Sequence, residues 1–135
     1  MKTRELQKVS KHRIGRVNKN NVDLEPHEDS TILYLAQFGF DIEVIRPTNV
    51  YKTKNPDVFM MGAIWEIKSP ISYNKSTIKS DFRRAAGQSD RVVFDLRRIK
   101  RHADDVKKQI IDIFQGRGRV RRLIIIEKGG RVLDF

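Results

Sequence analysis

Four consecutive aliphatic residues, Leu123 to Ile126, lie close to the end of the chain. A strand with one face in water alternates apolar and polar side chains, so an unbroken aliphatic run favours a strand that is buried on both faces. Within one domain, such a strand belongs to a sheet that carries helices on both sides. The 135 residues suffice for one such domain and not for two. The sequence therefore predicts an α/β fold, with a mixed central β-sheet flanked by helices.

The periodicity of the other apolar residues predicts where the helices and strands lie. Helices are indicated where apolar side chains recur every three or four residues, and strands where they alternate or form short runs. The helices are expected over about 25–39, 77–89 and 103–115, and the strands over 41–45, 58–60, 63–68, 92–94, 123–126 and 132–135. Residues 1–24 lack clear periodicity and are interpreted as an irregular basic arm, which precedes a single domain over residues 25–135.

The composition excludes several classes of protein. The chain has no cysteine, so it forms no disulfide, no zinc–thiolate centre and no cysteine nucleophile. Its apolar runs are far shorter than the roughly 20 residues that cross a bilayer, and no apolar segment of the secretory type follows Met1. We therefore expect no membrane partner, no secretion signal in this chain, and a site of action in the cytoplasm.

Basic residues exceed acidic residues, and the formal net charge is +11. Residues 1–24 hold seven basic and two acidic side chains, residues 97–122 hold ten and three, and residues 25–96 hold nine and ten. A domain with basic ends attracts polyanions, so nucleic acid is the expected partner; a solvated charged surface is the alternative. The residues expected to contact the nucleic-acid backbone are Lys75, Lys79, Arg83, Arg84, Arg97, Arg98, Lys100, Arg101, Arg117, Arg119, Arg121 and Arg122.

Two carboxylates and a lysine gather on the predicted hairpin. Glu66 and Lys68 are two residues apart on one strand, so their side chains lie on the same face. Asp57 opens the partner strand, and a tight turn at residues 61–62 brings it beside Glu66. Two converging carboxylates suit a hard divalent cation, Mg²⁺ or Mn²⁺, and the Ile67 carbonyl can supply a further oxygen. Lys68 can then activate a water molecule at the metal or hold a phosphate oxygen.

The residues Pro56-Asp57 and Glu66-Ile67-Lys68 match the PD-(D/E)xK nuclease signature. The same spacing also occurs on ordinary exposed strands with alternating charges. Here the match lies on a hairpin between two predicted helices, within a basic single domain, and this context favours the nuclease. The sequence thus predicts a restriction-endonuclease-like PD-(D/E)xK core and metal-dependent hydrolysis of phosphodiester bonds.

Two longer runs, Asn55-Pro56-Asp57 and Trp65-Glu66-Ile67-Lys68-Ser69-Pro70, are more specific than that signature. With them the chain resembles, over most of its length, the C-terminal tRNase toxin domain of contact-dependent growth inhibition (CdiA) proteins. The resemblance implies an endoribonuclease that acts on tRNA, ends a large secreted protein and is neutralised by an immunity protein. For single residues it implies that Asp57 and Glu66 bind the metal, that Lys68 is the catalytic lysine, that Glu28 completes the acidic site and that Gln88 lies near the same pocket.

Other functions stay open. Hydrolysis by a metal and water does not need the 2′-hydroxyl, so the site chemistry does not distinguish RNA from DNA, and the tRNA assignment rests on the resemblance. A DNA endonuclease or junction resolvase of the same superfamily is the nearest alternative, and a non-catalytic nucleic-acid-binding module is the alternative from another class. The basic surface predicts an acidic immunity protein. The oligomeric state stays open, and His27 is interpreted as a surface residue.

Overall fold

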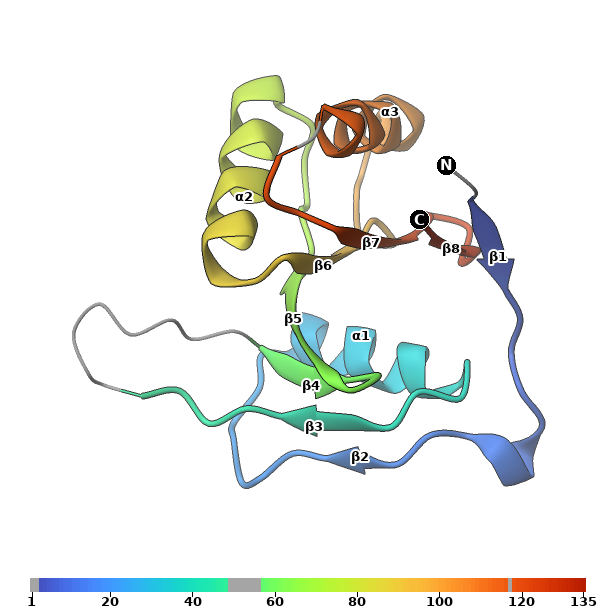
Figure 1. The fold of residues 1–135 in the computed structure, drawn as a ribbon. Helices are drawn as coiled ribbons and strands as arrows, with labels where there is room; N and C mark the ends of the chain where they lie inside the picture. Colours follow the sequence, from blue (N-terminus) through green and yellow to red (C-terminus); the bar gives the residue numbers. More distant parts are fainter. Residues whose placement is uncertain (1–2, 49–56, 117) are drawn as a thin grey trace.

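The structure is a computed structural model that describes residues 3–48, 57–116 and 118–135. Among these residues, eight strands form one sheet in the order β1-β8-β7-β6-β5-β4-β3-β2, and three α-helices pack on it (Figure 1). The strands are β1 (Arg4–Leu6), β2 (Val17–Asn18), β3 (Ile42–Val44), β4 (Val58–Met60), β5 (Ala63–Lys68), β6 (Arg91–Asp95), β7 (Arg122–Ile126) and β8 (Val132–Asp134). The helices are α1 (Pro26–Ala36), α2 (Lys75–Gln88) and α3 (Ala103–Gln115), and a 3₁₀ turn covers Lys11–Arg13.

The centre of the sheet is parallel, because β5 pairs with β6 and β6 pairs with β7 in this sense. Parallel neighbours need a crossover connection, and α2 and α3 supply the two crossovers. Antiparallel strands extend this centre, since β4 pairs with β5 and β8 pairs with β7. The predicted α/β class with a mixed central sheet is therefore confirmed.

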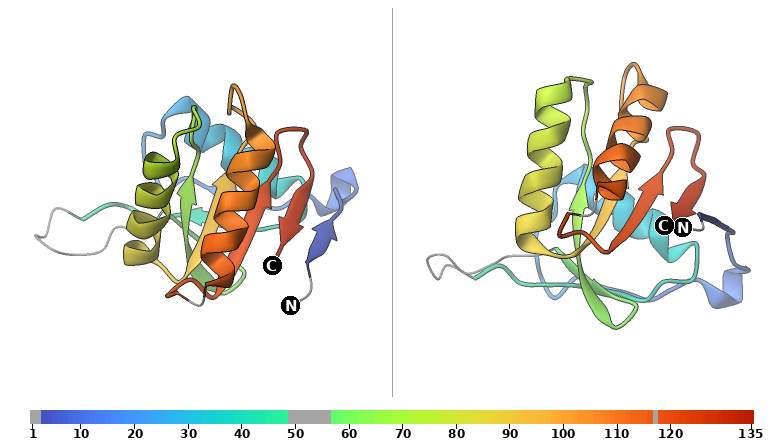
Figure 2. Two further views of the ribbon diagram at one scale, coloured as in Figure 1. Left: turned by 90° about the horizontal axis from the view of Figure 1, so that it is seen from above. Right: turned by 45° about the horizontal axis from the view of Figure 1, so that its top comes forward.

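Each face of the sheet has its own hydrophobic core. On one face α2 and α3 lie side by side, and Ile110 packs with Leu123 and Ile125 (Figure 2). On the concave face lies α1, where Leu35 packs with Ile124. Successive residues of β7 thus enter different cores, and the predicted burial of this strand on both faces is confirmed.

The hairpin of β4 and β5 turns at Met61-Gly62, as predicted. Both residues have positive φ, 53° and 72°, the geometry of the turns that match the twist of two paired strands. Gly62 adopts this conformation without strain because it has no Cβ. Trp65 follows the turn, is 1% exposed, and donates its Nε1–H to the Met60 carbonyl at 3.0 Å. Its ring belongs to the core between the sheet and α1.

The helix α2 begins two residues before the predicted start at Thr77. The Asn74 side chain accepts hydrogen bonds from the N–H groups of Ser76 and Thr77, and so caps the helix. The three helices have 11, 14 and 13 residues. Within the described ranges, no helix combines the length and the apolar character that a membrane crossing requires.

The segment before residue 25 differs from the predicted irregular arm. Its strands β1 and β2 pair with β8 and β3, and so form the two edges of the sheet. The intervening chain is held to the end of α1 by hydrogen bonds from Val9 N–H to Gln37 O and from Gly15 N–H to Ala36 O. A Cβ at Gly15 would lie 1.7 Å from Phe40 O, so this approach requires glycine. Edge strands of two or three residues are too short to show a periodicity.

A buried ionic cluster ties α1 to the end of β6. Asp95 is 3% exposed, and its carboxylate accepts hydrogen bonds from the Thr31 hydroxyl at 2.6 Å and from the Arg97 side chain at 2.8 to 3.2 Å. The Arg97 guanidinium also lies over the ring of Tyr34, 4.2 Å from its centroid. A buried charge is tolerated when it is paired and hydrogen-bonded. Here one partner, Thr31, lies in α1, and the other, Arg97, follows β6. The cluster therefore fixes the position of α1 on the sheet.

We expect Asp95→Ala to lower the free energy of unfolding by about 3 kcal/mol, because Arg97 and the Thr31 hydroxyl lose their buried partner. Urea denaturation followed by circular dichroism measures the change. The matched control is Asp90→Ala, which removes a partly exposed carboxylate that pairs with two arginines and should cost less than about 1 kcal/mol. Equal losses for the two variants would contradict the structural role of the cluster.

Candidate active site

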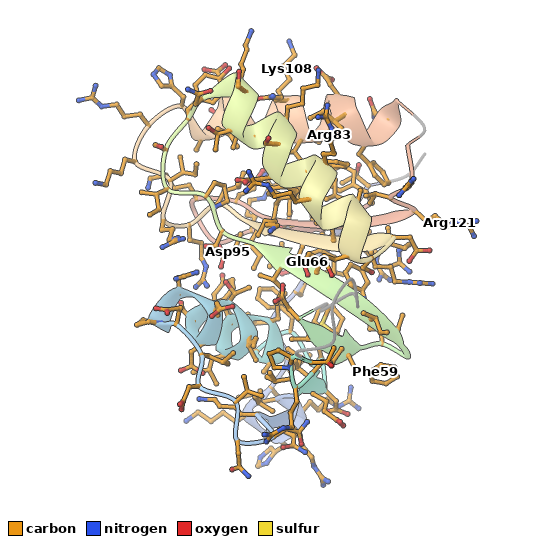
Figure 3. All side chains as sticks on the ribbon, turned by 90° about the vertical axis from the view of Figure 1, so that its left-hand side faces the viewer. Phe59, Glu66, Arg83, Asp95, Lys108 and Arg121 are labelled. Carbon is orange, nitrogen blue, oxygen red and sulfur yellow. The ribbon has the colours of Figure 1, made fainter. Side chains whose placement is uncertain are left out.

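A cavity of about 430 Å³ opens beyond the carboxyl end of β5. In open α/β sheets the carboxyl ends of the strands are the usual place for a ligand site. Figure 3 labels Glu66 of this cavity on β5, between α1 and α2. The lining residues are His27, Glu28, Asp57, Glu66, Ile67, Lys68, Ser69, Pro70, Ile71, Ser72, Thr77, Asp81 and Arg98.

Asp57 is held in the cavity by backbone groups of β5. Its Oδ2 accepts a hydrogen bond from the Ile67 N–H at 2.7 Å, and its own N–H donates to the Trp65 carbonyl at 3.2 Å. The register of the hairpin, in which Val58 pairs with Trp65, places Asp57 next to Glu66. The two carboxylates therefore meet, as the hairpin predicts.

Glu66 is buried, with 5% of its surface exposed. Its Oε2 lies 3.5 Å from the Nζ of Lys68, and its Oε1 has no hydrogen-bond partner in the part of the chain that the structure describes. Burial and the charge of Asp57, against the opposing charge of Lys68, raise the pKa of Glu66 to about 8. Burial also raises the pKa of Asp57, although the hydrogen bond from Ile67 N–H acts to lower it. Burial thus favours the protonated form of both carboxyl groups when no cation is bound.

Whether these residues suit a metal ion is judged from the Oε1 of Glu66, which has no hydrogen-bond partner among the described residues. A divalent cation between Asp57 and Glu66 would satisfy this oxygen and balance both carboxylates. The Ile67 carbonyl leaves β5 on the same side as the Ile67 N–H, which points to Asp57, so it faces the same space. Among the described residues, no three acidic or histidine side chains are arranged to hold an ion alone. Mg²⁺ and Mn²⁺ fit such a site, because they accept carboxylate, carbonyl, water and phosphate oxygens.

His27 and Glu28 reach the cavity from the first turn of α1. The Oε1 of Glu28 accepts a hydrogen bond from the Glu25 N–H at 2.9 Å, so this carboxylate also closes the capping box of the helix. Its charge acts on Asp57, whose pKa it raises, so Glu28 lies beside the acidic pair. His27, interpreted from the sequence as a surface residue, is half-buried and lines the cavity. The orientation of α1 on the sheet brings it there, and no local pattern signals it.

Gln88 is not brought into the acidic cavity. The crossover helix α2 runs back along β5, so its last residue lies near the start of that strand, where Gln88 lines a separate hollow with Ile64 and Arg119. In place of Gln88, α2 contributes Thr77 and Asp81 to the cavity. Asp81 belongs to no motif, and its one signal in the sequence is its position one helical turn after Thr77.

Of the predicted nucleic-acid contacts, Arg98 lines the acidic cavity. Its Nε–H donates to the Ser69 carbonyl at 2.7 Å and to the Ser69 hydroxyl at 3.1 Å. These bonds anchor the guanidinium where the chain leaves β5. Because a guanidinium carries further N–H donors in a planar fork, Arg98 keeps the capacity to bind a phosphate oxygen.

Arg97 and Arg122 have partners that the prediction did not anticipate. Arg97 pairs with Asp95 at 2.8 Å, and Arg122 pairs with Asp134 at 3.0 Å. Both carboxylates are buried and need cationic partners; Asp134 is paired with Arg4 as well, at 3.1 Å. We therefore assign both arginines to the stability of the fold. Arg117 lies outside the described residues, as do Asn55 and Pro56 of the predicted motifs.

The other predicted contacts are exposed on the surface. Lys75, Lys79 and Arg83 follow one another every four residues along α2, and so form a basic stripe on that helix. Arg83 is labelled on the outer side of α2 in Figure 3. The exposed set is Lys75, Lys79, Arg83, Arg84, Lys100, Arg101, Arg119 and Arg121.

The sequence that forms the hairpin and most of the sheet matches a protein-family model. The model of the contact-dependent growth inhibition CdiA C-terminal domain matches residues 54–132, which is more than half of the chain. The chain belongs to this family. The matched stretch includes Asp57, Glu66 and Lys68, and membership makes the chain a toxin domain of interbacterial competition.

A solved structure of a CdiA toxin has the same fold. It is the CdiA-CT/CdiI toxin and immunity complex from Burkholderia pseudomallei, which matches with a TM-score of 0.67 and 19% sequence identity. The match covers 90% of this chain and 98% of that chain. Among curated proteins, none matches this chain.

We expect the metal-free toxin domain to lose stability as the pH rises from about 4.5 to about 8. Glu66 ionises near 4.5 in the unfolded chain and near 8 in the folded protein, so between these values the unfolded state binds fewer protons and is favoured by rising pH. Glu66→Gln should reduce this decline, because the amide carries no charge. Thermal unfolding in EDTA across this range measures the effect. Glu43→Gln, at an exposed position of β3, is the control. If the stability of Glu66→Gln fell with pH as steeply as that of the wild type, the raised pKa of Glu66 would be contradicted.

Proposed function

We propose that this toxin domain is a metal-dependent endonuclease with a restriction-endonuclease-like PD-(D/E)xK core, and that it cleaves tRNA. One observation carries the proposal: Glu66 is buried beside Asp57 with one oxygen that has no hydrogen-bond partner among the described residues, and the Lys68 Nζ is 3.5 Å from its other oxygen. A buried acid with a structural role has its oxygens satisfied by donors. Two neighbouring acids whose carboxylate oxygens outnumber the hydrogen-bond donors around them form an arrangement that binds a cation.

The residues of the cavity have different roles in this reaction. The carboxylates of Asp57 and Glu66 and the carbonyl of Ile67 would hold Mg²⁺ or Mn²⁺, which supplies Lewis acidity toward the scissile phosphate. Lys68 places its ammonium beside the same oxygens, where it can hold a phosphate oxygen or orient the attacking water. Arg98 lies at the wall of the cavity and can bind a phosphate. Both cations would offset the negative charge that develops on the phosphodiester.

The choice of tRNA depends on the family, because the cavity chemistry is common to RNA and DNA. Hydrolysis by a metal and water leaves the 2′-hydroxyl unused, so no group in the cavity needs to recognise it. The motifs that resemble CdiA tRNase domains, Asn55-Pro56-Asp57 and Trp65–Pro70, support RNA. The exposed basic stripe on α2 suits the backbone of either polyanion.

The proposed setting is competition between bacteria. The domain would be delivered as part of a larger secreted toxin and would act in the cytoplasm of the target cell. A cognate immunity protein would protect the cell that makes the toxin. The similar Burkholderia structure is a toxin and immunity complex, which supports such a partner here.

Purified protein should degrade tRNA in total bacterial RNA when Mg²⁺ or Mn²⁺ is present, and should not do so in EDTA. Glu66→Gln and Lys68→Ala should each lower the cleavage rate at least about a hundredfold, because one removes a metal ligand and the other a charge that stabilises the transition state. Denaturing gels of time courses on RNA and on linear and branched DNA measure the rate and the substrate class. Glu43→Gln should keep the wild-type rate.

Each of the other outcomes would exclude part of the proposal. Cleavage of DNA alone would keep the nuclease and discard the tRNA assignment. Equal activity in EDTA, or in Glu66→Gln, would contradict the metal-dependent mechanism. Binding without cleavage of any of these substrates would indicate a nucleic-acid-binding module.

The immunity protein should carry an acidic surface that complements the basic toxin. We expect the association rate to fall as the ionic strength rises, and to fall roughly tenfold when Lys75, Lys79, Arg83 and Arg84 are replaced together by alanine. Surface plasmon resonance at several salt concentrations measures both effects. A rate that changes with neither salt nor the four substitutions would contradict electrostatic recognition.

A further inference from the structure

An apolar pair lies exposed on the hairpin, at the start of β5, and lines the hollow that is separate from the acidic cavity. Phe59 of β4 and Ile64 of β5 are register partners, and they are 46% and 43% exposed. Ile64 and Glu66 are two residues apart on β5, so their side chains lie on the same face, about 7 Å apart along the strand. The helix α2 packs on β5 and β6, and the Phe59 ring projects from the hairpin beyond it (Figure 3).

Charged side chains of both signs lie near this apolar pair, and Glu43 of β3 is the other register partner of Phe59. A hollow of about 650 Å³ lies beside Phe59, and Arg91 and Arg119 contribute to its lining. Asp90 also lines the hollow and pairs with Arg91 at 3.0 Å, whereas Arg119 is exposed. Arg121 extends at the same end of the molecule (Figure 3). An exposed aromatic ring with an exposed arginine beside it is a combination with which proteins bind single-stranded nucleic acid.

One flank of α2 connects this hollow with the acidic cavity. Thr77 and Asp81 line the cavity, and Gln88 lines the hollow. These residues share a flank with the exposed Arg84, because successive members are three or four positions apart. From Asp81 to Gln88 the helix rises about 10 Å, a distance that a short stretch of extended nucleic acid covers. A strand with its scissile phosphate in the cavity can therefore pass Arg84 and reach Phe59.

We propose that Phe59 is a stacking platform for an unpaired base close to the scissile phosphate. The inference rests on the proposed nuclease function and deepens it, because it makes single-stranded segments of RNA the substrate. A base inside a duplex is stacked on its neighbours and is not free to cover Phe59, whereas an unpaired base can turn outward onto an aromatic ring. Ile64 widens the platform, and Arg119 binds the backbone of the same nucleotide.

The charge of the surroundings favours RNA over a protein as the occupant of this surface. The apolar area is a single cross-strand pair, and the hollow beside it includes the exposed Arg119 and the pair of Arg91 with Asp90 in its lining. Its position also continues from the cavity in which the proposed reaction takes place. A protein that docked on the hairpin would use the same apolar atoms without needing the arginines.

The test measures RNA binding in EDTA, where metal-dependent cleavage does not interfere. Wild type, Phe59→Ala and Met61→Ala are compared by fluorescence anisotropy with a short labelled single-stranded RNA and with the duplex of the same sequence. Met61 is the matched control, since it is 45% exposed on the same hairpin but lies at the turn. Phe59→Ala should weaken single-strand binding roughly tenfold, the size of one base–aromatic contact, and should leave duplex binding unchanged. Met61→Ala should change neither.

A conservative variant and an abasic strand separate stacking from a general loss of binding. Phe59→Trp should keep the wild-type affinity because its ring also stacks. With an abasic site at the stacked position, Phe59→Ala should have no further effect. Thermal unfolding should show that all three variants remain folded, since the substituted side chains are exposed.

Unchanged RNA affinity in Phe59→Ala would overturn the platform, and so would equal losses for single strand and duplex. If Phe59→Ala instead weakened only the complex with an immunity protein, the hairpin would be a protein-docking surface and the proposal would be wrong. These affinities are measured without metal, so they stand even if no cleavage is found. An absence of Mg²⁺-dependent cleavage would count against the proposed function and not against the platform.

Discussion

The fold depends on keeping both faces of β6 and β7 away from water. Their aliphatic side chains alternate between the α1 core and the core under α2 and α3, so helices must cover the sheet on two sides. The strand β5 lies under α2. It is buried at Trp65 and reaches the open cavity at its carboxyl end, where the chain leaves the sheet for α2. The acidic site is thus a consequence of how two helical layers share one sheet.

Buried acids serve two purposes in this domain. Asp95 and Asp134 are each paired with arginine, and Asp95 also accepts a hydrogen bond from Thr31. Glu66 is as deeply buried, but it lies beside a second acid, and one of its oxygens has no hydrogen-bond partner within the described part of the chain. Burying a charge is unfavourable unless it is compensated, so the paired acids stabilise the fold, whereas the acidic pair at β5 would be compensated by the proposed metal ion.

Elements with a local signal were predictable, and those defined by distant partners were not. The hairpin, the three helices and the β7 strand follow from turn residues and from periodicity within a few positions. The strands β1 and β2 have two or three residues and exist because β8 and β3 accept them. Likewise, Arg97 and Arg98 are adjacent in a basic run, yet one pairs with a buried acid and the other lines the cavity.

By itself the sequence determined the two-sided sheet and the approach of Asp57 to Glu66, because strand alternation and a tight turn act over a few residues. Only the tertiary structure decided which basic side chains stay available to bind a phosphate. The packing of α1 buries Asp95, and Arg97 is therefore needed as its partner. The tertiary structure also decided that His27 faces the cavity and that Gln88 lies away from it. The direction of a helix over the sheet is set by its crossover, and a crossover joins strands that are far apart in the chain.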